Sequence, residues 1–161
     1  MDLEGILKDG AKNIAETKKL AKRLKKKKPK DLDQKVHQLH EETFNEIDCL
    51  DCGNCCKTTS PAIHDKDVDR LAKHLRVKPV DLIAQHMEMD NEGDYVFRSA
   101  PCPFLGADNY CSVYEARPLA CREYPHTNRK RFYQVVELSV RNTEICPAVV
   151  RILDELKKAY S

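Results

Sequence analysis

The chain has 161 residues, of which 34% are charged and 41% hydrophobic, so its size suits one domain with a core of its own. It has no apolar run of the length that a membrane-spanning helix needs. The acidic start, Met1-Asp2-Leu3-Glu4, does not resemble a secretory signal, so we expect a cytoplasmic protein with reduced thiols rather than a disulfide framework.

The net charge of +2 is unevenly spread along the chain. Residues 1–30 hold ten Lys and one Arg against four acidic residues, a local charge of +7, and the remainder carries −5. A basic arm on an acidic body is a candidate for contact with a protein, a nucleic acid or a membrane surface. The simpler interpretation is a solvated helix end, because Lys25 to Lys28 suit the negative end of a helix dipole before Pro29.

Apolar residues at spacings of three and four predict a helix over residues 2–28 and a second helix over about 31–47, capped by Asp31. We expect residues 1–47 to form a basic helical arm. Residues 48–161 then form a cysteine-cluster domain that binds metal.

Further helices are predicted after Asp65 and from about Val80, separated by a break at Lys78-Pro79. Residues 95–97 suit a short strand, and residues 112–121 suit a short helix in which Pro118 marks a new first turn. Residues 131–140 fit either a helix or a strand, and we favour a helix. The last helix is predicted to begin at Cys146-Pro147. The expected fold class is mainly α: a small, loop-rich helical domain organised around a cysteine metal site, with an N-terminal helical arm.

Four of the eight cysteines stand within eight positions, as Cys49-Leu-Asp-Cys52-Gly-Asn-Cys55-Cys56. Cysteines three positions apart can turn both thiolates toward one ion, and Gly53 supplies backbone freedom. Neighbouring side chains point apart, so Cys55 and Cys56 are expected to serve different sites or to bridge two metals. A thioredoxin-like dithiol would need a βαβ setting, which this pattern lacks.

The complete cysteine pattern resembles a known family. It runs as C-x2-C-x2-C-C, Cys102-Pro-Phe-Leu, a segment from Cys111-Ser-Val-Tyr to Cys121-Arg-Glu-Tyr-Pro, and Cys146-Pro. This is similar to the YkgJ-type cysteine-cluster family, a zinc- or iron-chelating domain with eight cysteines, over about residues 49–155. The resemblance implies that all eight cysteines are metal ligands, which are Cys49, Cys52, Cys55, Cys56, Cys102, Cys111, Cys121 and Cys146.

The residues leave two kinds of metal centre as alternatives. The three cysteines Cys49, Cys52 and Cys55, at successive C-x2-C spacings, favour an iron–sulfur cluster, and eight thiolates also fit two Zn²⁺ ions. The first functional hypothesis is therefore a metal-handling or electron-transfer protein. The alternative is a structural zinc domain whose basic arm binds a protein or nucleic acid. An iron–sulfur oxidoreductase or a metal-assisted transferase comes third, because no active-site motif accompanies the cysteines and catalytic residues are unknown.

Overall fold

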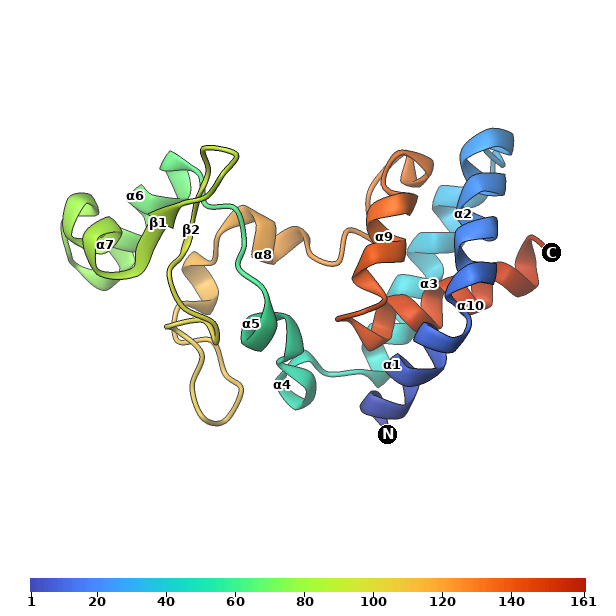
Figure 1. Ribbon diagram of the computed structural model, residues 1–161, viewed down its shortest axis with the longest axis horizontal. Helices are drawn as coiled ribbons and strands as arrows, with labels where there is room; N and C mark the ends of the chain where they lie inside the picture. The colour runs from blue at the N-terminus through green and yellow to red at the C-terminus, as the bar shows by residue number, and fades with distance from the viewer. The chain divides into compact units, whose positions relative to one another are not determined.

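The computed structural model describes all 161 residues and consists of ten α-helices, two short 3-10 helices and one two-stranded hairpin (Figure 1). The predicted fold class, mainly α, is confirmed. The chain divides into two compact units, of which the first comprises residues 1–52 and 125–161 and the second residues 53–124. None of the helices combines the length and the apolar character needed to cross a membrane.

The first unit is a helical bundle built from both ends of the chain. Its elements are α1 (Leu3–Lys12), α2 (Ile14–Lys27), α3 (Leu32–Glu46), α4 (Cys49–Cys52), η2 (Phe132–Gln134), α9 (Val136–Asn142) and α10 (Pro147–Ala159). Helix α10 packs against α1, α2 and α3, and α9 packs against α2. The helices of residues 1–47 therefore share a core with the C-terminal helix, and the predicted boundary after residue 47 remains a prediction.

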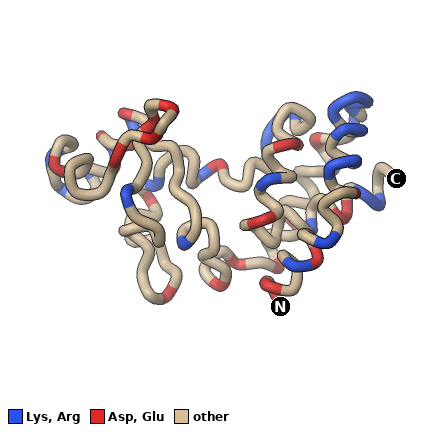
Figure 2. The backbone as a smooth tube through the Cα atoms, viewed as in Figure 1, with Lys and Arg blue, Asp and Glu red and all other residues tan.

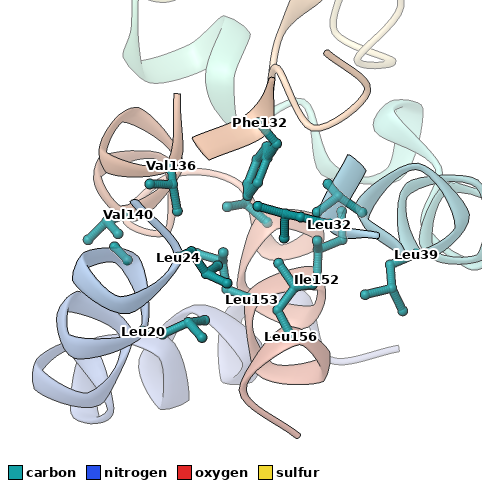
Figure 3. Packing of buried hydrophobic residues seen from close by; sticks show 13 residues of the cluster. Leu20, Leu24, Leu32, Leu39, Phe132, Val136, Val140, Ile152, Leu153 and Leu156 are labelled. Carbon is teal, nitrogen blue, oxygen red and sulfur yellow. The ribbon is translucent and has the colours of Figure 1, made fainter. Parts of the chain in front are cut away.

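The core of the first unit surrounds α10, as Figure 3 shows for the labelled side chains. Its fully buried members include Leu20 and Leu24 of α2, Val36 of α3 and Ile152 and Leu156 of α10. Each such side chain contributes about 1.5–3 kcal/mol through its removal from water. Apolar burial thus supplies this unit with a stable frame next to its cysteines.

The single helix predicted over residues 2–28 is divided in two at Asn13. Its two halves bury different faces, because α1 packs on α10 while α2 also packs on α9. Gly10 allows the close approach of α1, since a Cβ atom there would lie 2.8 Å from a methyl carbon of Val150.

Other predicted boundaries in the first unit are confirmed. Helix α3 begins after Asp31, although the Asp31 carboxylate accepts a hydrogen bond from the Tyr160 hydroxyl at 2.9 Å instead of capping the helix. Helix α10 begins at Pro147, directly after Cys146. Residues 131–140 form η2 and most of α9, as the helix interpretation predicted.

The second unit is smaller and richer in loops. Its elements are α5 (Asn54–Thr58), α6 (Asp65–Leu75), α7 (Pro79–His86), β1 (Met87–Met89), β2 (Tyr95–Phe97), η1 (Tyr114–Ala116) and α8 (Leu119–Glu123). The predicted strand at residues 95–97 is confirmed, and its antiparallel partner β1 pairs Met87 with Phe97. The helix predicted over residues 112–121 is divided into η1 and α8, and Pro118 precedes α8 at its N-cap.

Candidate metal centre

All eight cysteines are free thiols, so no disulfide joins any of them. Three of them, Cys49, Cys52 and Cys146, belong to the first unit, and the other five belong to the second. Only Cys49 is exposed, and the rest are half-buried. Each unit therefore holds its own set of thiols, which the order of the cysteines along the chain does not reveal.

The set in the first unit joins residues that lie almost a hundred positions apart. Helix α4 carries Cys49 and Cys52, and Cys146 is the N-cap residue of α10. Burial raises the pKa of Cys146 to about 11, and the charges of Cys49 and Cys52 act in the same direction. The sulfurs of Cys49 and Cys52 are therefore close enough to Cys146 to influence its pKa, and the backbone N–H groups of Ala148 and Val149 act to lower it.

The second unit brings its cysteines together through main-chain pairing. The N–H of Cys102 donates to the carbonyl of Cys56 at 2.7 Å, and Leu105 forms an isolated antiparallel bridge with Cys111. Burial, together with the charges of Cys56, Cys102 and Cys111, raises the pKa of Cys121 to about 12. Cys56, Cys102, Cys111 and Cys121 thus form one electrostatically connected set of four thiols.

Backbone N–H groups favour the thiolate forms of two members of this set. Those of Phe104 and Leu105 act to lower the pKa of Cys102, and that of Val113 acts to lower the pKa of Cys111. Burial nevertheless raises the pKa of both cysteines. Hydrogen bonds to sulfur tune thiolate ligands in metal centres, so three loops, after Cys102, Cys111 and Cys146, share a feature of metal-binding cysteine loops.

A family model described as "CxxCxxCC: Putative zinc- or iron-chelating domain" matches residues 48–147, well over half of the chain. The chain belongs to this CxxCxxCC family. The match spans all eight cysteines, from Cys49 to Cys146, and confirms the family that the sequence pattern indicated. No curated protein and no solved structure is significantly similar to the chain.

The donors of the CxxCxxCC domain fit the chemistry that its family describes. Thiolates are ligands that both zinc and iron–sulfur clusters accept, and the domain presents eight of them without a disulfide. The carboxylate oxygens of Asp90, Glu92 and Asp94, in the turn between β1 and β2, lie within 4.8 Å of one another.

The adjacent cysteines Cys55 and Cys56 lie within α5. Gly53, the N-cap residue of α5, has a left-handed φ of 54°. A hydrogen bond from the Cys55 side chain lowers the pKa of Cys56 to about 7; burial opposes this shift, and the positive charge of Arg117 adds to it. Arg117 likewise favours the thiolates of Cys111 and Cys121.

Asp67 is a supporting residue of the CxxCxxCC domain that the sequence did not single out. Its carboxylate is buried in α6 and accepts hydrogen bonds from the N–H of His64 and the N–H of Leu119, at 3.0 and 3.1 Å. Arg70 donates to Asp67 at 2.6 Å and to the carbonyl of Arg117 at 2.7 Å. Asp67 and Arg70 thereby fasten the turn that leads into α8 and Cys121.

Proposed function

We propose that the eight cysteines are the ligands through which this domain chelates metal, and that Cys56, Cys102, Cys111 and Cys121 act as one four-thiolate set. Cys49, Cys52 and Cys146 belong to a second set, and Cys55 is also a predicted ligand. The observation that carries the proposal is that the family match over residues 48–147 spans all eight cysteines, none of which forms a disulfide. Backbone N–H groups near Cys102, Cys111 and Cys146 add support, because they favour the thiolate form that a metal ligand takes.

We favour an iron–sulfur cluster, because Cys49, Cys52 and Cys55 repeat the spacing of a ferredoxin loop. When bound, such a cluster supplies reversible one-electron chemistry, so the function proposed is electron transfer or metal handling. The residues of the chain hold the thiolates in place, and the guanidinium of Arg117 offsets part of their negative charge.

A structural zinc domain is the second candidate. Its support comes from the set of Cys56, Cys102, Cys111 and Cys121, because four thiolates from one unit match the closed Cys₄ sites of structural zinc. In that case the metal would hold the loops of the second unit together, and the domain would carry no electrons.

Elemental analysis of anaerobically purified protein separates these candidates. Iron with acid-labile sulfide and a brown colour would establish a cluster, and a colourless protein containing zinc would establish the structural role. Protein that is folded but free of both metals would contradict the proposal.

Two single substitutions test the division of the cysteines into sets. We expect Cys121→Ser and Cys146→Ser each to lower the metal content per chain while leaving part of it bound, because each removes a ligand from only one set. Ser99→Ala is the control, since Ser99 is an exposed residue of the loop that leads to Cys102. Full metal content in both cysteine variants would refute the assignment of these ligands.

A further inference from the structure

Two basic segments that are about a hundred residues apart in the sequence meet at one end of the first unit. The first is the C-terminal half of α2 with the turn that follows, and the second is the loop at residues 129–131. The ammonium group of Lys28 lies 4.9 Å from the centre of the Tyr133 ring, two residues beyond that loop. Helix α2 also packs directly on η2, which begins at Phe132.

Helix α3 holds the loop in a defined position. The carboxylate of Asp33 accepts hydrogen bonds from the N–H groups of Arg131 and Phe132, at 2.7 and 2.9 Å. His37 bonds the carbonyl of Arg129 at 2.9 Å, and His40 bonds the Thr127 hydroxyl at 2.6 Å. The Asp33 and His37 contacts engage backbone groups of residues 129–131 and leave the basic side chains of these residues exposed.

The resulting surface is strongly positive. No acidic residue occurs between Glu16 and Asp31. The nearby carboxylates already have partners, because Asp33 binds the loop, Asp31 binds Tyr160, and Glu137 pairs with Lys25 at 3.1 Å. We call this surface the basic patch, and its exposed cations are Lys18, Lys19, Lys22, Arg23, Lys25, Lys26, Lys27, Lys28, Lys30, Arg129, Lys130 and Arg131.

We propose that the basic patch binds the phosphate backbone of a nucleic acid. Figure 2 shows basic residues gathered along α2, where Lys18, Lys22 and Lys26 follow one another at intervals of four residues. That interval is about 6 Å along a helix, so the lysines form a row of cations. Nucleic acid is the partner with the matching charge density, about one negative charge per 1.7 Å of duplex, and neutralising it releases bound counterions.

An anionic membrane fits the basic patch less well. The exposed large hydrophobic residues of the chain are Met1, Leu50, Val77, Val80, Met89, Tyr110, Tyr114 and Leu119, and none of them lies in α2 or in the loop at residues 129–131. A helix that lies in a membrane interface needs such residues on its buried face. The proposal does not depend on which metal the cysteines hold.

Fluorescence anisotropy with a short labelled DNA duplex and an RNA strand tests the proposal on the full-length, metal-loaded protein. We expect binding, and we expect the logarithm of the association constant to fall linearly with the logarithm of the salt concentration. The triple variant Lys22→Gln, Lys26→Gln, Lys130→Gln should bind at least about tenfold more weakly, and its salt slope should be shallower by up to about 3, because each phosphate contact contributes about 0.9.

The matched control removes the same charge from the second unit, at exposed lysines of α6 and the following turn: Lys66→Gln, Lys73→Gln, Lys78→Gln. The affinity of this control variant for nucleic acid should lie within about twofold of that of the unaltered protein. Three outcomes would overturn the proposal: no binding to either nucleic acid, an equal loss in both triple variants, or tighter binding to phosphatidylserine vesicles than to nucleic acid. Unchanged circular dichroism of both variants verifies that they are folded.

Discussion

Gly53 shows how one residue sets the direction of the cysteine loop. Its φ of 54° lies in the left-handed region, where any side chain is strained, and it separates α4 from α5. A Cβ atom at this position would also lie 3.1 Å from the side-chain Cγ and Oδ1 of Asn109. Gly53 is therefore favoured at this position both by its left-handed backbone conformation and by the nearby Asn109 side chain.

We expect Gly53→Ala to destabilise the protein by about 1–2 kcal/mol through backbone strain, with a further cost from the contact with Asn109. Gly93→Ala is a matched control, because Gly93 also has a positive φ, of 86°, but no atom would lie within 4 Å of its Cβ. Chemical denaturation of both variants measures the difference. If Gly93→Ala were the more destabilising change, the contact with Asn109 would carry no weight.

At the scale of the elements, α6 and α8 depend on each other through Asp67. The carboxylate completes the N-terminal capping box of α6 and also accepts the N–H of Leu119, the first residue of α8. Helix α8 has few residues of its own to stabilise it, because it spans only five. The ion pair of the buried Asp67 carboxylate with the partly exposed Arg70 thus helps to position the segment that carries Cys121.

Replacing Asp67 by Asn should destabilise the protein by about 2–4 kcal/mol, because an amide leaves the buried partners of a carboxylate incompletely satisfied. Asp69→Asn alters an exposed acid of the same helix and should change stability by no more than about 0.5 kcal/mol. Urea unfolding at neutral pH compares the two variants. Equal effects would mean that the Asp67 contacts contribute nothing.

The same carboxylate predicts a dependence of stability on pH. Burial raises the pKa of Asp67, but the hydrogen bonds from His64, Arg70 and Leu119 outweigh this effect and hold the pKa below its usual value. A lowered pKa in the folded state stabilises the protein above the usual carboxyl pKa, and this contribution is lost as the pH falls through the lowered pKa. The stability difference between the unaltered protein and Asp67→Asn should therefore shrink with acidification, and a constant difference would contradict the assignment.

At the scale of the whole molecule, the sequence predicts local features better than it predicts which segments meet. The start of α10 follows from Pro147, because a proline acts within one turn, and Asp31 marks the start of α3 by its position although its side chain does not cap the helix. The break at Asn13 depends on how α1 and α2 pack on other helices, so helical periodicity alone could not locate it. Tertiary packing overrides local preference in such cases.

The candidate site shows the same limit. Spacing and family resemblance indicated the eight cysteines, but only folding places Cys146 beside Cys49 and Cys52 and gathers Cys56 with three distant partners. Asp67 gave a faint signal, because it stands three residues after His64 at a helix start. Its bond to Leu119 spans 52 residues and has no counterpart in the sequence pattern.

The central claim is that metal bound by the cysteines holds the domain in its folded form. Thermal unfolding followed by circular dichroism, on the purified metal-loaded protein and on the same protein after chelation, tests it most directly. We expect metal removal to lower the melting temperature by about 10 °C or more and to reduce the helical signal, because metal binding to thiolates is coupled to folding. Metal-free protein with the same melting temperature and the same helical content would contradict the claim.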